Sequence, residues 1–125
     1  MDIEEKVNFW KNEAKRALAV AEDLVRLKRY IEALFFGHLA LEKLLKARII
    51  KATKEESVYS HDLLILAKYA KLRLSGNDID FLAKVNVYNI RARYQDYKMS
   101  LYKQADRKFT TMELSEIKRF FDKIK

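Results

Sequence analysis

The sequence contains no proline, no cysteine and only two glycines among its 125 residues. All-β sandwiches and barrels need many tight turns, which proline and glycine usually form, so the scarcity of these two residues favours long helices. The lack of cysteine excludes a disulfide framework, a thiolate metal site and a cysteine nucleophile, and it fits a reducing compartment. Half of the residues are hydrophobic, enough for a substantial core. We therefore expect a single domain, residues 1–125, that is located in the cytoplasm.

Long apolar runs are also missing. The most apolar stretch, residues 33–41, is interrupted by His38 and is far shorter than the ~20 residues that span a bilayer. Residues 1–5 lack the basic segment that begins a secretion signal. We expect neither a membrane-spanning segment nor secretion.

Apolar residues recur at intervals of three and four along most of the chain, which is the pattern of amphipathic helices. The second such segment has apolar residues around its whole circumference, so we expect it at the centre of the fold. Short connections between long helices predict an all-α fold, an antiparallel up-and-down bundle of four to five helices. The predicted helices cover about residues 3–27, 30–51, 61–74 and 79–93, followed by a last helix that contains Leu114, Ile117, Phe120 and Phe121.

Capping and turn residues mark the expected boundaries. Ser60 or Asp62 is expected to cap the third helix, and Thr110 or Thr111 the last one. Ser75–Gly76–Asn77 is a turn signal, and residues 94–109 have the pattern of a loop or frayed helix.

The net charge of +8 favours phosphate-bearing partners or acidic protein surfaces. Residues 84–108 hold much of the excess, with seven cations and two anions, and tyrosines are interleaved among them. Cations and aromatic rings together suit phosphate contacts and base stacking. The alternative is that these tyrosines anchor a solvated loop or form a protein interface. The candidate nucleotide- or RNA-binding residues are Arg91, Arg93, Tyr94, Tyr97, Lys98 and Lys103.

A polar strip follows the apolar line of the fourth predicted helix. Asn86, Asn89 and Arg93 share one face there, with Asp96 just beyond the expected helix end. The strip either faces a ligand or a dimer cleft, or supplies hydrogen bonds at a helix end.

Only two histidines occur. His38 precedes Glu42 by one helical turn, which suits a fragment of a metal site, an acid–base pair or a satisfied packing group. His61, next to Asp62, has the position of a capping or packing residue. The sequence contains no zinc-protease, phosphate-loop, nucleophile-elbow or dinucleotide motif, so we expect no metal, no cofactor and no self-contained catalytic centre. Lysine supplies 17 of the 26 cations, a bias that favours a thermophilic source.

Four pieces of the sequence together resemble the HEPN domain family. They are Trp10 with the alanine-rich helix after it, the segment from Arg29–Tyr30 through residues 33–47 (ALFFGHLALEKLLKA), His61–Asp62–Leu63, and residues 89–96 (NIRARYQD). The second piece is fairly specific and the others are weak alone.

The resemblance implies a helical bundle that forms a two-fold dimer and acts with a minimal nucleotidyltransferase, in several cases as a toxin–antitoxin pair. It also implies a test for catalysis. Ribonucleases of the family carry an arginine, four to six intervening residues and then a histidine. Counting from Arg91, those positions hold Asp96, Tyr97 and Lys98, and counting from Arg93 they hold Lys98, Met99 and Ser100.

No imidazole is available there for proton transfer near neutral pH, which argues against the family's ribonuclease mechanism. A tyrosine that some family partners modify with adenylate is matched only by Tyr102, and only with Ser100 in the histidine position. We therefore expect a non-catalytic nucleotide- or RNA-binding subunit. Two alternatives stay open. One is a ribonuclease with an atypical site, in which Asp96 and either Arg91 or Arg93 replace the usual pair, or in which His38 or His61 reaches the cleft. The other is a purely structural interaction partner.

Overall fold

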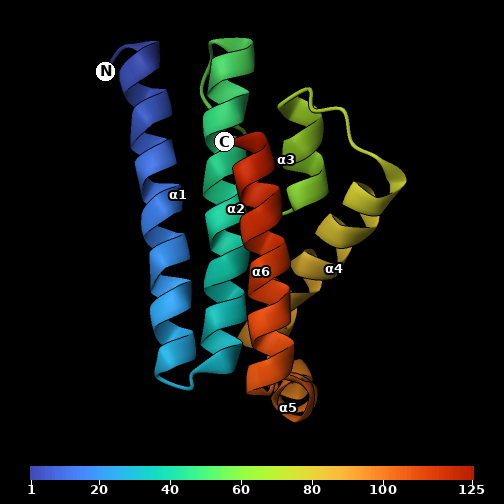
Figure 1. The fold of residues 1–125 in the computed structure, drawn as a ribbon. Helices are drawn as coiled ribbons and strands as arrows, with labels where there is room; N and C mark the ends of the chain where they lie inside the picture. Colours follow the sequence, from blue (N-terminus) through green and yellow to red (C-terminus); the bar gives the residue numbers. More distant parts are fainter.

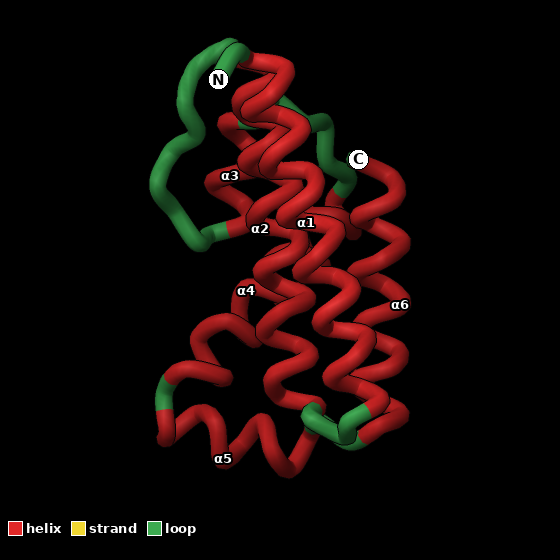
Figure 2. The backbone as a smooth tube through the Cα atoms, turned by 90° about the vertical axis from the view of Figure 1, so that its left-hand side faces the viewer, coloured by secondary structure: helices red, strands yellow, loops and turns green.

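The chain folds into a helical bundle in a computed structural model that describes the backbone of residues 1–125 and the side chains of residues 1–94 and 98–125 (Figure 1). The prediction of an all-α bundle is confirmed, and the described backbone contains six helices and no strand. Helices α1 and α2 form an antiparallel hairpin, α6 runs beside α2 toward the same end, and α5 crosses the lower end (Figures 1 and 2). The helices are α1 (Ile3–Arg26), α2 (Tyr30–Thr53), α3 (Leu63–Tyr69), α4 (Gly76–Arg93), α5 (Gln95–Gln104) and α6 (Arg107–Ile124).

Helix α2 lies at the centre, as its apolar pattern predicts. It contacts each of the other five helices, and leucines such as Leu34, Leu41 and Leu45 are fully buried. The buried side of α1 carries small residues, among them Ala14 and Ala21, so the two long helices pack closely. Although α2 is strongly apolar, neither it nor any other described helix is long and apolar enough to cross a membrane.

Helix α6 packs against the middle of α2 at Gly37. A Cβ added there would lie only 2.8 Å from Ile117 Cδ1 and 3.0 Å from Leu114 Cδ2. The missing side chain therefore lets the two helices approach each other. Phe120 and Phe121 are buried on the same helix, in agreement with the predicted apolar stripe.

The third helix is shorter than the prediction of residues 61–74. It begins after Asp62, whose carboxylate accepts hydrogen bonds from the Leu64 and Ile65 amides, and it ends at Tyr69. Lys71 then adopts a left-handed conformation with φ of 59° and closes the helix end. The predicted length was wrong because Leu72 and Leu74 continue the apolar spacing while they pack against the core from non-helical backbone.

Three further boundaries differ from the prediction. Ser75 is the N-cap of α4 and forms a reciprocal capping box with Asp78, so Gly76–Asn77 lies inside the first helical turn and not in a turn before it. Residues 95–104 form α5, where a loop or frayed helix was expected. Asp106 caps α6 by accepting a hydrogen bond from the Phe109 amide, so neither predicted threonine is the cap.

Candidate functional site

The corner between α4 and α5 holds most of the predicted binding residues. Tyr94 ends α4 in an extended conformation (φ −105°, ψ 126°), and this single residue turns the chain into α5. Leu101 on α5 is fully buried and anchors that helix to the bundle. Helix α5 therefore lies across the lower end of the bundle beside the start of α2 (Figure 2).

Arg91 holds this corner together. Its guanidinium donates one hydrogen bond to Gln104 Oε1, at 2.8 Å, and another to Ser100 Oγ, at 2.9 Å. Both acceptors lie on α5, so the side chain ties α4 to α5. Arg91 is thus a positioning residue, although its remaining N–H groups could still reach a ligand.

Arg93 and Lys98 stand beside each other between two hollows in the surface. The larger hollow has a volume of about 400 Å³ and the smaller, on the α2 side, about 160 Å³. Both are lined by Ala92, Arg93 and Lys98. Cationic head groups from α4 and α5 therefore meet at one place. The larger hollow is completed by Met99 and Tyr102, and the smaller by Ile31, Glu32, Phe35 and Phe36.

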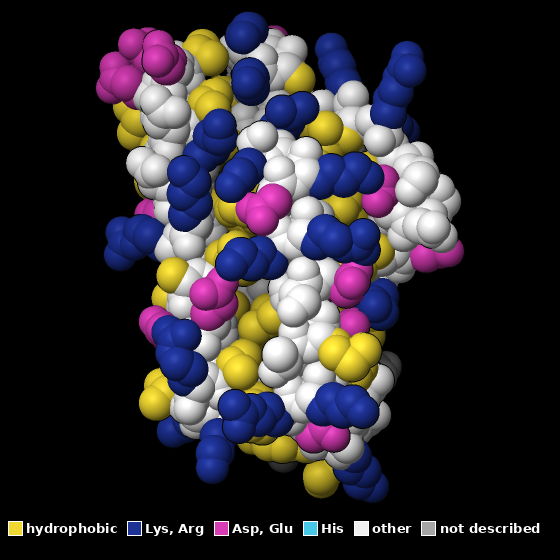
Figure 3. Space-filling model, in the orientation of Figure 1, with side chains coloured by type: hydrophobic (Ala, Val, Ile, Leu, Met, Phe, Trp, Pro, Cys, Tyr) yellow, Lys and Arg dark blue, Asp and Glu magenta, His cyan; other side chains and the backbone are white. Residues whose placement is uncertain are grey.

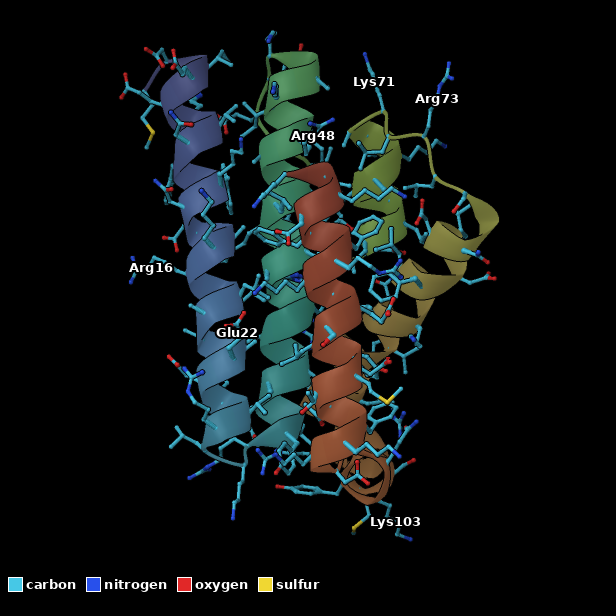
Figure 4. The ribbon with its side chains drawn as sticks, viewed as in Figure 1. Arg16, Glu22, Arg48, Lys71, Arg73 and Lys103 are labelled. Atoms are coloured by element: carbon cyan, nitrogen blue, oxygen red, sulfur yellow. The ribbon has the colours of Figure 1, made fainter. Side chains whose placement is uncertain are left out.

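Aromatic rings surround these two cations. The Arg93 guanidinium lies 5.7 Å from the centre of the Tyr94 ring, and Tyr94 and Tyr102 are 54% and 63% exposed. Lys103, in contrast, projects away from the lower end of the bundle and does not line either hollow (Figure 4). Two further predicted residues, Asp96 and Tyr97, lie outside the described side chains. The structure thus brings together Arg93, Tyr94 and Lys98 with Tyr102.

The two asparagines of the predicted polar strip act inside the fold. Asn86 accepts a hydrogen bond from the Leu63 amide and donates one to Asp62 Oδ1, both at 2.9 Å. Asn89 is buried and donates to His38 Nδ1 at 3.4 Å. The helix-end interpretation of this strip is therefore the one that the geometry favours, and only Arg93 on that face remains open to a ligand.

His38 is a buried hydrogen-bonding residue. It is 0% exposed, and its Nε2 lies 2.9 Å from the His61 carbonyl oxygen. Donation from Nε2 leaves Nδ1 to accept from Asn89, which is the arrangement of a neutral imidazole. Burial lowers the pKa of His38, because the charged form would lose its hydration, and the nearby Glu42 carboxylate opposes that shift only in part. This histidine cannot reach a substrate.

Glu42 and His61 form a second polar contact, which joins α2 to the segment before α3. The buried carboxylate of Glu42 lies 2.8 Å from His61 Nδ1 through Oε1 and 3.4 Å from Lys46 Nζ through Oε2. The His61 side chain is 46% exposed, so its Nε2 side faces outward from the pair. A carboxylate on Nδ1 orients an imidazole for acid–base chemistry. Among the described residues, no group of three metal-ligating side chains accompanies it.

Tyr88 belongs to the core and not to the exposed tyrosine cluster. Its hydroxyl donates to Glu113 Oε1, and Lys84 Nζ lies 3.0 Å from the same oxygen. Burial, reinforced by the adjacent carboxylate, raises the pKa of Tyr88 above its usual range. This tyrosine therefore helps to pack α4 against α6 and is not available to a ligand.

Comparison with known proteins decides the family. A sequence profile for the HEPN domain matches residues 7–124. The chain belongs to the HEPN family. The crystal structure of TT1696 from Thermus thermophilus is similar to this HEPN chain in fold, with a TM-score of 0.78 over 94% of each chain, at 19% sequence identity. A search of curated protein sequences found no match.

Sequence reasoning missed several side chains of this HEPN site. Phe35 and Phe36 were assigned to the second apolar helix, yet they line the smaller hollow from α2. Tyr102 was one of the tyrosines interleaved with the cations and a weak modification candidate, but it was not among the predicted binding residues. A signal for Phe35 and Phe36 was present, because the second helix has apolar residues around more of its circumference than one packed face can bury. The contact between Glu42 and His61 had no signal, because it joins residues far apart in the sequence.

Proposed function

We propose that this HEPN protein is a non-catalytic subunit that binds a nucleotide or RNA at the α4–α5 corner. The observation that carries this proposal is that Arg93 and Lys98 line two adjoining hollows, with the exposed ring of Tyr102 in the larger one and the exposed ring of Tyr94 next to Arg93. Two cations suit a phosphate group, and a tyrosine ring suits a base. Glu32 lines the α2 side of the smaller hollow, so its carboxylate would disfavour phosphate there and direct it toward the larger one.

The absence of catalysis follows from the residues after α4. A ribonuclease of this family would need a histidine at residues 96–98 or 98–100, and the sequence has none. Lys98 and Ser100 are poor substitutes because a lysine is protonated and a serine hydroxyl is un-ionised near neutral pH. Arg91 is engaged by α5. Binding is therefore the chemistry that this corner supports best.

We further propose a two-fold homodimer that forms through the outer face of α4. Ile79, Val87 and Ile90 are 45%, 42% and 46% exposed, and with Ala83 and Tyr94 they form one apolar stripe. At 1.5 Å per residue the stripe is roughly 22 Å long. One stripe can pack against its own copy in an isologous interface. Light scattering is expected to give a mass near twice 14.9 kDa, and near 14.9 kDa for Val87→Glu.

The partner we propose is a minimal nucleotidyltransferase, with which the HEPN protein would form a two-part system in the cytoplasm, such as a toxin–antitoxin pair. Support comes from the family resemblance and from the sequence after Arg91 and Arg93, which has no histidine at residues 96–100. Co-purification with the product of a neighbouring gene would test this partner. A complex whose amount does not change when nucleotide is added would favour the purely structural alternative.

Calorimetric titration tests the binding site directly. We expect wild-type protein to bind ATP or a short RNA, and the double variant Arg93→Gln, Lys98→Gln to bind at least ten-fold more weakly. The matched control is Lys15→Gln, Arg16→Gln, which removes the same charge from the exposed side of α1. Equal weakening by the control, or no binding by wild type at millimolar ligand, would contradict the proposal.

A second candidate function is ribonuclease activity that uses His61. Of the two histidines, His61 suits this activity better, because His38 is buried whereas His61 is half-exposed and held by Glu42. Incubation of micromolar protein with a mixed RNA pool tests it. Cleavage that is lost in His61→Ala and in Arg93→Ala, but retained in Arg16→Ala, would support the enzyme; intact RNA would eliminate it.

A further inference from the structure

A second group of cations lies at the opposite end of the bundle from the α4–α5 corner. It comes from the C-terminal ends of α2 and α3, which are in contact, and from the segment after α3. Figure 4 shows Lys71 and Arg73 projecting from the upper end of the molecule, with Arg48 beside them on α2. We call this group the upper cationic surface. Its members are Arg48, Lys51, Lys54, Lys68, Lys71 and Arg73.

These six cations are not neutralised by neighbouring acids. None of them lies within ion-pairing distance of a carboxylate among the described side chains. Some cations of the long helices are paired, for example Lys43 with Glu13 and Lys118 with Glu22, whereas the six here share one end of the bundle without any such pair among the described side chains. In Figure 3, Lys and Arg side chains project from the upper ends of α2 and α3, as they do elsewhere on this face, whereas Asp and Glu gather over the start of α1.

Few acidic residues near these six cations in the sequence offset their positive charge. Between residues 47 and 75 they are Glu55, Glu56 and Asp62. Glu56 forms an ion pair with Lys6 of α1. Asp62 lies at the beginning of α3, at the far end of that helix from Lys71, and caps it. Only Glu55 remains to offset six cations.

Helix dipoles explain part of this arrangement but not all of it. Cations in the last turn of a helix are favoured by the dipole, which accounts for Lys51 and Lys68. Lys54 and Lys71, however, adopt left-handed conformations with φ of 63° and 59°, where glycine is less strained. Arg73 lies beyond the end of α3 and outside the range of its dipole.

An exposed aromatic ring stands among these cations. Tyr69 is 50% exposed, follows Lys68 directly and precedes Lys71 by two residues at the end of α3. Ile65, one turn earlier, is also exposed and extends the apolar area. A positively charged surface with an exposed ring is the combination that binds single-stranded nucleic acid, with cations on phosphates and the ring on a base. Because protein interfaces also use tyrosine, competition with an acidic polymer is included in the test below.

We propose that the upper cationic surface binds single-stranded RNA, with Lys51, Lys54 and Lys71 contacting phosphates and Tyr69 stacking on a base. The surface is separate from the α4–α5 corner. Phe36 borders that corner, and Lys51 lies fifteen residues further along α2, roughly 22 Å away at 1.5 Å per residue. Binding here therefore does not depend on the function proposed for the corner.

The test uses the full chain in an Arg93→Gln, Lys98→Gln background, so that binding at the corner does not contribute. Fluorescence anisotropy measures the affinity for a labelled single-stranded RNA of twelve nucleotides at several salt concentrations. In this background we expect binding to persist. Replacing Lys51, Lys54 and Lys71 with glutamine should lower the slope of log affinity against log salt by about 2 and weaken binding roughly 100-fold at 0.1 M salt, if each contacts one phosphate.

Two further variants separate this site from a general effect of charge. A control variant removes an equal number of charges from α1 through Lys11→Gln, Lys15→Gln and Arg16→Gln. It is expected to weaken binding less than three-fold. Tyr69→Ala leaves the charge unchanged and is expected to weaken binding about ten-fold.

Three outcomes would overturn the proposal: no RNA binding in the background protein, equal weakening by the α1 control, or no effect of Tyr69→Ala. A fourth is competition by polyglutamate as strong as competition by unlabelled RNA at equal charge, which would assign the surface to an acidic protein instead. Circular dichroism of each variant checks that the bundle remains folded.

Discussion

The contact between Gly37 and α6 makes a quantitative prediction about packing. In an open helical position, replacing glycine with alanine stabilises a helix by about 1 kcal/mol. At Gly37, however, the new methyl group would lie 2.8 Å from Ile117 Cδ1 and 3.0 Å from Leu114 Cδ2. Overpacking of this kind costs about 2 kcal/mol, so Gly37→Ala should lower the free energy of unfolding by about 1 kcal/mol.

Ile117→Val removes the Cδ1 atom that causes the closest of these contacts. By itself this substitution should cost about 1 kcal/mol, because it leaves a small cavity in the core. In the double variant the new methyl group fills that space. The two losses should then largely cancel, which gives a coupling free energy of about 2 kcal/mol in a double-mutant cycle.

Urea denaturation, followed by circular dichroism, measures each free energy of unfolding. Gly76→Ala is the matched control, since a Cβ there has no atom within 4 Å, and this variant should be neutral or slightly more stable than wild type. Our account of the contact between α2 and α6 is refuted if Gly37→Ala stabilises the protein as the control does. It is equally refuted if the effects of the two single substitutions add to within about 0.5 kcal/mol.

Four further predictions address single side chains. The pKa of His38 lies below its ordinary value of 6.5, so the folded protein favours the neutral imidazole. The free energy of unfolding should therefore fall as the pH drops below about 6.5 and level off above it. Thermal melts at several pH values measure this dependence, which should be smaller in His38→Gln. Thr110 is fully buried and its hydroxyl has no hydrogen-bond partner among the described residues, so Thr110→Val should raise the free energy of unfolding by about 1 kcal/mol in urea; a loss of stability would argue against this account. Lys28 closes α1 with φ of 60°, so Lys28→Gly should stabilise the protein by about 0.5–1 kcal/mol, and destabilisation would show that the left-handed residue carries no strain. Arg91→Met removes both hydrogen bonds to α5, so amide hydrogen exchange of residues 98–104 should become faster while exchange in α1 changes little. Unchanged exchange would mean that these two hydrogen bonds do not hold α5 in place.

The sequence predicts the long helices more accurately than the short ones. The ends of the first, second and fourth helices were predicted to within about three residues, because their apolar stripes extend over many turns. The third helix and α5 were not, since each is short and tertiary contacts define it. Leu72 and Leu74 continue the helical spacing while packing from irregular backbone, which spacing alone cannot distinguish.

The structure brings some of the predicted site residues together and gives others a different role. The region around Arg93 and Lys98 was selected from its charge and its tyrosines, and both residues do border one pair of hollows. Arg91 has the same charge and was assigned the same role, yet it is bound to α5. The sequence contains no signal for that difference, because Ser100 and Gln104 become neighbours of Arg91 only when the chain turns at Tyr94.

The sequence by itself determined the helical class, the central position of α2 and the missing histidine after α4. Each of these depends on residue type or on the spacing along one helix, which local geometry decides. Only the tertiary structure decided that His38 and Asn89 are buried partners, that Glu42 holds His61, and that the cations of α2 and α3 gather at one end. These features depend on which helix faces meet, and hydrogen bonds and charge act over a few ångströms in space regardless of separation along the chain.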